Sequence, residues 1–136
     1  MNLSIVIPAH NEENRIRTTL EEYYNFFRNI KKRKNLNFEI IVVLNACKDR
    51  TEQVVKDIAK NKKEIKYLNF KKIGKGFAII EGFKYSISQK FDFIGFVDAD
   101  MSTPPSAFYD LVKNIKDYDG IIASRWLKDS IIKTKQ

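Results

Sequence analysis

The sequence predicts an α/β protein with an open, doubly wound, mostly parallel sheet that carries helices on both faces. Three observations predict it. Short apolar runs alternate with segments whose apolar residues recur every three or four positions. The runs are mostly continuous rather than alternating, as is typical of parallel strands buried on both faces. The chain has 136 residues, of which 43% are apolar and 12% aromatic, so it can build the core of one domain and is unlike a disordered chain.

The first half of the chain predicts two strands and two helices. Residues 3–7 form the first apolar run. A helical face follows, made of apolar residues at spacings of three and four: Ile16, Leu20, Tyr23, Phe27 and Ile30. Residues 38–44 form the second strand. Asp49, followed three residues later by Glu52, then predicts a capping box for a helix with the apolar residues Val54, Val55, Ile58 and Ala59.

The second half repeats this order. Residues 65–70 are the third strand, and a helix after the stretch 74–76 (GKG) is expected to bury Ile80, Phe83 and Ile87. Residues 91–97 are the fourth strand. Thr103 and Pro104 predict the N-cap and first turn of a helix whose apolar residues are Phe108, Leu111, Val112 and Ile115. Residues 120–123 are the fifth predicted strand.

Charge and cysteine content limit the class of protein. There are 25 Lys and Arg against 17 Asp and Glu, a net charge of +8. The cations are scattered along the chain, which favours solvated faces over nucleic-acid binding; attraction to an anionic membrane surface or to phosphorylated substrates is the alternative. A single cysteine, Cys47, excludes an internal disulfide and is typical of a reducing compartment. The run 3–7 is too short to span a bilayer, so we expect a cytoplasmic protein, with peripheral contact to the membrane as an option.

Two carboxylates give the sharpest chemical signal. Asp98 and Asp100 follow the fourth strand and are separated only by Ala99. On an extended chain their side chains would project to the same side, roughly 7 Å apart. Such an oxygen-rich site suits Mg²⁺ or Mn²⁺, which fills its remaining positions with water and phosphate oxygens. The alternative is that both residues merely end a strand and cap the next helix, but buried like charges repel unless something neutralises them.

Other polar residues also follow predicted strands, where doubly wound sheets bind ligands. Lys75, between two glycines at a helix start, can bring a cation and backbone N–H groups to a phosphate. The surrounding residues match neither a dinucleotide fingerprint, because Ile79 stands at the third glycine, nor a P-loop. His10 is either an ordinary loop histidine or a contact to a base.

Four stretches resemble glycosyltransferase family 2 enzymes with the GT-A fold, in particular the dolichyl- and polyprenyl-phosphate sugar transferases. They are residues 6–13 (VIPAHNEE), 74–76 (GKG) with 82–85 (GFKY) behind, 97–105 (VDADMSTPP) and 123–125 (ASR). Their order and spacing match the N-terminal, nucleotide-sugar-binding part of that family. The chain departs from the family where residues 44–47 (LNAC) replace an Asp-Asp-Gly-Ser type sequence, and where Ala123 replaces a usual glycine.

The resemblance implies a role for each matching residue. Pro8, His10 and Glu12 would line the nucleobase and ribose site, and Asp98 and Ala99 would hold the nucleoside. Asp100 would bind the metal that bridges the diphosphate, with Ser102 nearby, and Lys75 and Arg125 would face phosphate or sugar. Asn45 would contact a base edge through its amide. Asp100 and Arg125 are accordingly the expected catalytic residues, with Mg²⁺ or Mn²⁺ as cofactor.

The function predicted from these residues is inverting transfer of a hexose from UDP-glucose or GDP-mannose to a polyprenyl phosphate. We expect a donor-binding half over residues 1–125 and a tail over 126–136, and the early end of the chain suggests a fragment, a split half or a reduced protein. Apolar residues of that tail would favour a homo-oligomer or a complementary chain. The alternatives are a donor-binding module that needs a partner chain, and a phosphatase of the haloacid-dehalogenase type, which also uses an Asp-x-Asp sequence.

Overall fold

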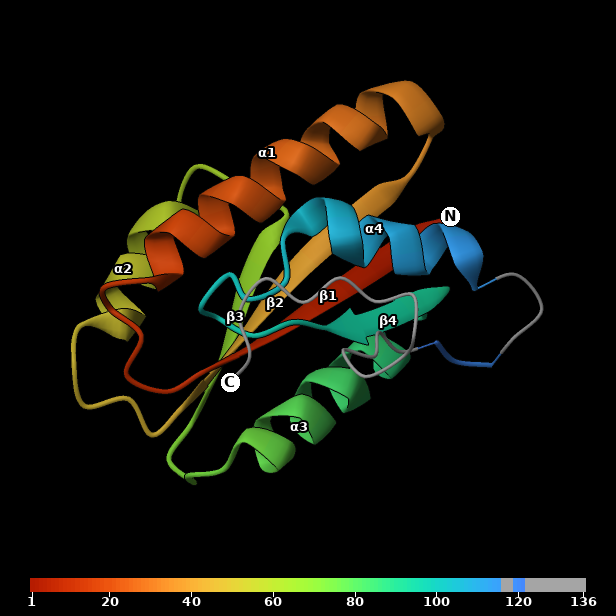
Figure 1. Ribbon diagram of the computed structural model, residues 1–136. Helices are drawn as coiled ribbons and strands as arrows, with labels where there is room; N and C mark the ends of the chain where they lie inside the picture. Colours follow the sequence, from red (N-terminus) through yellow and green to blue (C-terminus); the bar gives the residue numbers. More distant parts are fainter. Residues whose placement is uncertain (116–118, 122–136) are drawn as a thin grey trace, which may run out of the picture.

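Four parallel strands form one sheet in the order β3-β2-β1-β4, as the computed structural model shows (Figure 1). The structure describes residues 1–115 and 119–121. The elements are β1 (Asn2–Ala9), α1 (Ile16–Lys34), β2 (Asn37–Asn45), α2 (Thr51–Ala59), β3 (Ile65–Phe70), α3 (Lys75–Ser88), β4 (Phe93–Phe96) and α4 (Pro105–Asn114).

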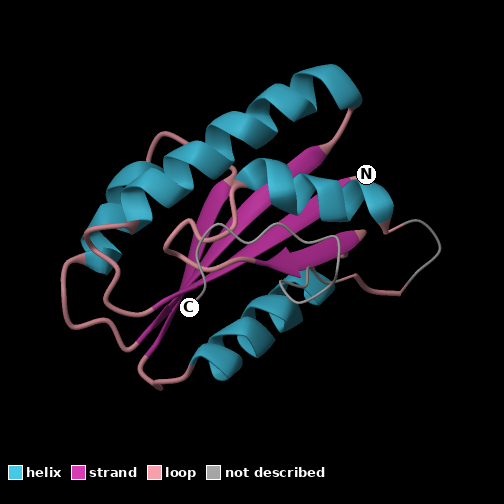
Figure 2. Ribbon diagram, viewed as in Figure 1, coloured by secondary structure: helices cyan, strands magenta, loops and turns pink. Residues whose placement is uncertain are grey.

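The sheet has helices on both faces, so the predicted doubly wound α/β class is confirmed (Figure 2). On one face, α1, α2 and α4 cover alternate side chains of β1 and β2, among them Ile5 and Val42. On the other face α3 lies over Val6, Ile41 and Val43. Because β1 and β2 are buried on both sides, their sequences are continuous apolar runs.

The strands that flank this central pair are less buried than the sequence predicted. β4 covers only four residues of the expected range 91–97, and its Phe96 is 46% exposed. Among the described residues β4 has a neighbour on one side only, β1, which explains this exposure. Of the predicted fifth strand 120–123, Gly120 and Ile121 are not in a strand, and positions 122–123 lie outside the described residues.

Helix α1 buries the predicted face. Of the three residues predicted for the buried face of α3, only Phe83 packs against the core, where it is half-buried, and the prediction is wrong for Ile80 and Ile87. Ile80 and Ile87 are 56% and 65% exposed, and the buried residues of α3 are Ala78, Gly82 and Ser86. Small side chains are required there because α3 lies close against β1: a Cβ atom at Gly82 would lie 2.4 Å from Cγ1 of Val6. The helix therefore contacts the sheet mainly through its smallest residues, and Ile80 and Ile87 face outward.

Two helix starts differ from their predicted caps. The predicted capping box of α2 does not form: the helix begins at Thr51, and the Asp49 side chain accepts a hydrogen bond from the Thr51 N–H instead (2.9 Å). Helix α4 begins one residue later than expected, with Pro104 as N-cap and Pro105 as its first residue. In the part of the chain that the structure describes, no helix is both long enough and apolar enough to cross a membrane.

Candidate functional site

A cleft of about 430 Å³ opens at the carboxyl ends of the strands, where the loops after all four strands meet. The chain order reverses between β1 and β4, which is where doubly wound sheets bind their ligands. The structure brings together all the expected nucleotide-sugar-binding residues and Asp100. The cleft is lined by Pro8, His10, Glu12, Asn45, Ile73, Gly74, Lys75, Asp98, Ala99 and Asp100.

The His10 side chain is fixed in one tautomer by its neighbours. Its Nδ1 lies 2.7 Å from the backbone carbonyl oxygen of Asn45, so Nδ1 carries the proton and donates. Its Nε2 accepts from the Asn11 amide at 3.3 Å. Two hydrogen bonds therefore hold the ring at the end of β2, whereas the side chain of an ordinary exposed loop histidine needs no such contacts.

Asn45 is 97% buried and uses its amide to join three segments of the chain. With the amide oriented to satisfy both atoms, Nδ2 donates to the carbonyl of Ala9 (2.8 Å) and Oδ1 accepts from the N–H of Gly74 (3.2 Å). These bonds tie the ends of β1 and β2 to the loop before α3. Because these bonds use both atoms of a buried amide, the contact of Asn45 to a base edge stays a prediction.

The loops after β1 and β2 are joined by side chain to backbone bonds. Asn11 Oδ1 accepts from the N–H of Lys48 (2.8 Å), and the Glu12 N–H donates to the fully buried Thr51 hydroxyl (2.8 Å). Asp49 accepts from the Glu13 N–H (3.2 Å). Burial raises the pKa of Asp49, but the hydrogen bonds from Thr51 and Glu13 outweigh it, so this pKa lies below its ordinary value.

Every loop of the cleft contains a residue with a positive φ. Asn11, Ala46 and Met101 have φ angles of 52°, 54° and 62°, and Gly74 has 141°. Such conformations are costly for residues other than glycine and tend to gather at functional sites. Ala46 stands where the Asp-Asp-Gly-Ser type sequence quoted above has its glycine, the residue that adopts a left-handed backbone most readily.

The two aspartates of the Asp-Ala-Asp sequence have different partners. Asp98 forms an ion pair with Lys75 at the start of α3. The chain turns at Ala99 and Asp100, so the extended geometry predicted for this pair is wrong. Asp100 instead accepts the Ser102 N–H at 3.0 Å, and Ser102 Oγ lies 3.5 Å from Asp98.

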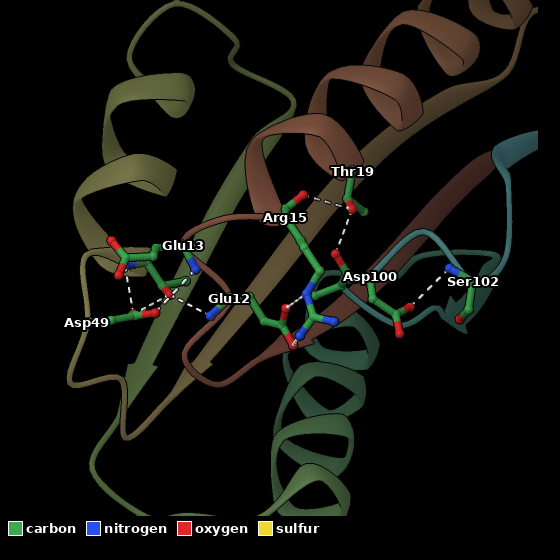
Figure 3. Close-up of polar contacts among 9 residues, drawn as sticks. Glu12, Glu13, Arg15, Thr19, Asp49, Asp100 and Ser102 are labelled. Carbon is green, nitrogen blue, oxygen red and sulfur yellow. Dashed lines mark hydrogen bonds and ion pairs between the residues drawn. The ribbon is translucent and has the colours of Figure 1, made fainter. Parts of the chain in front are cut away.

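Three further side chains lie beside the site: Arg15, the N-cap of α1, and Thr19 and Tyr23 within α1. None of them was among the predicted site residues, and Figure 3 shows Arg15 and Thr19. Arg15 forms a two-bond ion pair with Glu12, at 2.6 and 2.8 Å. The Thr19 hydroxyl donates to the carbonyl of Ala99 (2.6 Å), and the Tyr23 hydroxyl donates to the carbonyl of Thr103 (2.7 Å). The only signal in the sequence was hydroxyl groups at a spacing of four on an otherwise apolar helix face.

The charge around Asp100 keeps it ionised. The Ser102 N–H is the main cause that lowers the pKa of Asp100 below its ordinary value; burial opposes this shift, and the positive charge of Arg15 adds to it. An ionised carboxylate facing a cleft is the form that binds a cation.

The residues present fit a hard divalent cation. Asp100 uses Oδ1 for the Ser102 N–H, which leaves Oδ2 as a donor. Within the described ranges no three His, Cys, Asp or Glu residues gather into a closed metal site. A single carboxylate completed by water and phosphate oxygens is a common mode for Mg²⁺. Arg125, the other expected catalytic residue, lies outside the described residues.

Comparison with known proteins gives a consistent match. The model of the family described as "Glycosyl transferase family 2" matches residues 4–135. A dolichyl-phosphate beta-glucosyltransferase of Trichomonas vaginalis is 35% identical over 84% of this chain, which covers 35% of that protein. A dolichol-phosphate mannosyltransferase of Pyrococcus furiosus is 33% identical over 94% of the chain and 34% of its own length. The chain thus spans about a third of the curated relatives it matches.

The fold matches solved structures as well. A mannosyltransferase from Pyrobaculum calidifontis, solved with GDP-Man and Mn²⁺, superposes with a TM-score of 0.68 at 20% identity, over 85% of this chain and 32% of that one. At this identity the match supports the fold alone. The family match leaves no support for the haloacid-dehalogenase alternative.

Proposed function

We propose that this chain, which belongs to glycosyl transferase family 2, binds a nucleoside diphosphate sugar in the cleft between the ends of β1 and β4. We further propose that it serves the transfer of the hexose to a polyprenyl phosphate. The names of its relatives, a dolichyl-phosphate glucosyltransferase and a dolichol-phosphate mannosyltransferase, support this acceptor.

One observation carries the donor assignment. Oδ2 of Asp100, the ammonium group of Lys75 and the loop after β1 all line one cleft. Lys75 begins α3, so its ammonium group and the first N–H groups of the helix are available to a diphosphate. Asp100, across the cleft, offers oxygen to a cation. The β1 loop, with Pro8, His10 and Glu12, then forms the wall where a base and ribose would lie.

The residues suggest how transfer would proceed. A lipid phosphate is already anionic at neutral pH, so one of its oxygens can attack the anomeric carbon without a general base while the bond to the nucleoside diphosphate breaks. This single displacement inverts the anomeric carbon. The main task of the protein is then to stabilise the departing diphosphate. Lys75 would contribute to that, and Arg125 is the second cation that the sequence suggests.

A divalent cation bound at Asp100 would neutralise negative charge on the diphosphate. Asp100 would hold it, Ser102 would keep the carboxylate oriented through its N–H, and Asp98 would hold Lys75 near the phosphates. The Mn²⁺ or Mg²⁺ requirement is therefore part of this proposal.

Titration calorimetry tests the donor assignment. We expect the chain to bind UDP or GDP, and the matching UDP-glucose or GDP-mannose, more tightly with Mn²⁺ than in EDTA. ADP serves as the mismatched control. Equal and weak binding of all the nucleotides, unaffected by the cation, would contradict the proposal.

Transfer itself needs a separate assay. Radiolabelled hexose on polyprenyl phosphate, measured with the chain at increasing concentration, distinguishes an enzyme from a donor-binding module. We expect these 136 residues to bind the donor, because all the residues assigned to the donor lie at or before Arg125. We expect little transfer, because none of the assigned residues binds the acceptor. Efficient transfer would show that the acceptor site is also built from this chain.

A further inference from the structure

Helix α1 presents two hydroxyl side chains, one turn apart, that bond to the loop carrying the Asp-Ala-Asp sequence. They are Thr19 and Tyr23, which share one face because their spacing is four residues. The N-cap residue Arg15, just before the helix, pairs with Glu12 instead. The rest of this face is apolar and packs into the core, with Ile16, Leu20 and Phe27 fully buried. Polar groups on such a face need partners, and both hydroxyls find them in this loop.

The two hydroxyls bond to the two ends of the loop. Thr19 is fully buried, and its Oγ1 lies 2.6 Å from the carbonyl oxygen of Ala99, closer than the carbonyl of Arg15 one turn back (3.2 Å). Tyr23 is also fully buried and donates to the carbonyl of Thr103 at 2.7 Å. Burial raises the pKa of Tyr23, so this hydroxyl keeps its proton and donates at any physiological pH.

The loop between these two carbonyls is not part of a regular element. It follows the end of β4 and contains Met101 at a φ of 62°. Within the loop, the Asp100 carboxylate accepts a hydrogen bond from the Ser102 N–H. Its orientation relative to the cleft therefore depends on what holds its ends.

We propose that Thr19 and Tyr23 are positioning residues, which fix both ends of the 99–103 loop so that the Asp100 carboxylate faces the cleft in the geometry that a cation and a diphosphate need. The expected effect on cation affinity rests on the proposed function, whereas the restraint of the loop by the two hydroxyls does not. Residues outside the ligand shell that orient a metal-binding carboxylate typically change metal affinity 10–100-fold when altered.

Four variants test this inference. Thr19→Val removes the hydroxyl and keeps the shape, and Thr19→Ser restores the hydroxyl. Thr18→Val is the matched control, because Thr18 is the neighbouring residue on the exposed side of α1. Tyr23→Phe removes the second bond while it keeps the ring in the core.

Two measurements are needed. Without any ligand, hydrogen exchange in peptides spanning residues 97–104 should be about 10-fold faster in Thr19→Val and Tyr23→Phe than in the parent, and unchanged in Thr18→Val and Thr19→Ser. With saturating UDP or GDP, whichever the parent binds, the Mn²⁺ affinity of Thr19→Val should fall about 10–100-fold, while nucleotide affinity in EDTA should change by less than about 3-fold.

The outcomes separate the two proposals. If the parent binds neither nucleotide but exchange still rises in the two hydroxyl variants, the loop restraint holds and the proposed function fails. If Thr19→Val and Tyr23→Phe show parental exchange and parental Mn²⁺ affinity, the positioning role is wrong. An equal loss of nucleotide affinity in EDTA and in Mn²⁺ would also overturn it, because a general loss of structure would then explain the effect. Should Thr19→Val fail to fold, Tyr23→Phe alone decides.

Discussion

Replacing Gly82 by alanine should destabilise the fold and weaken donor binding, because α3 rests on the sheet at this position. The added Cβ would lie 2.4 Å from Cγ1 of Val6 and 3.1 Å from Cγ2 of Val43. Carbon atoms in contact normally lie about 3.5–4.0 Å apart. Both valines are fully buried on central strands, so they cannot turn away into solvent. The helix must therefore move outward by about 1 Å.

The net cost follows from two opposing effects. Overpacking in a core costs about 1–3 kcal/mol, and a contact this short belongs at the upper end. Alanine returns up to about 1 kcal/mol through its better helix propensity. We expect the free energy of unfolding to fall by about 2 kcal/mol, and Tm by roughly 7 °C. Because α3 begins at Lys75, the same displacement should weaken Mn²⁺-dependent nucleotide binding.

Gly76→Ala is the matched control in the same helix. A Cβ at Gly76 meets no atom within 4 Å, so this variant gains the helix propensity without the clash. Urea and thermal unfolding of both variants give the comparison. Stability of Gly82→Ala at or above that of the parent would refute the close packing of α3 on β1.

Three further predictions concern the loops of the cleft. Ala46→Gly should raise the unfolding free energy by about 1 kcal/mol in urea titration, because Ala46 has a φ of 54° that glycine adopts freely; a loss of stability would contradict this. Asp49 has a lowered pKa, so its contribution is present above the unfolded-state pKa and is lost as the pH falls through the folded-state value. Stability of the parent should therefore fall more steeply below about pH 4 than that of Asp49→Asn, and parallel curves would argue against it. Asn45→Asp should cost about 1–3 kcal/mol at pH 7, because a carboxylate oxygen would face the Ala9 carbonyl oxygen; unchanged unfolding would place the amide bonds in doubt.

The sequence predicted the fold where burial is complete on one face or both. The apolar spacing of α1 and the continuous runs of β1 and β2 follow directly from burial, so the pattern determined them. It failed for most of α3, because Ile80 and Ile87 are exposed and the buried residues of the helix are Ala78, Gly82 and Ser86. Close approach of a helix to a sheet selects small residues, which a hydrophobic pattern does not record.

The cleft was predicted in its composition but not in its geometry. Strand ends placed Lys75, Asp98 and Asp100 together, because parallel strands bring their carboxyl ends to one edge. The turn at Asp100 and the bonds from Thr19 and Tyr23 could not be predicted, since they depend on how α1 lies over a loop some 80 residues away in the chain.

The most direct test of the donor site is the Mn²⁺ dependence of nucleotide binding in Asp100→Ala. The matched control is Asp110→Ala, which removes a largely exposed carboxylate of α4 that forms a surface ion pair with Lys113. Calorimetric titration of UDP and GDP, each with Mn²⁺ and with EDTA, is performed on the parent and both variants. We predict that Asp100→Ala loses the Mn²⁺-dependent gain in affinity by at least about 10-fold, keeps the binding seen in EDTA, and that Asp110→Ala behaves as the parent. A Mn²⁺-dependent gain of the same size in Asp100→Ala would contradict the assignment of this carboxylate to the cation.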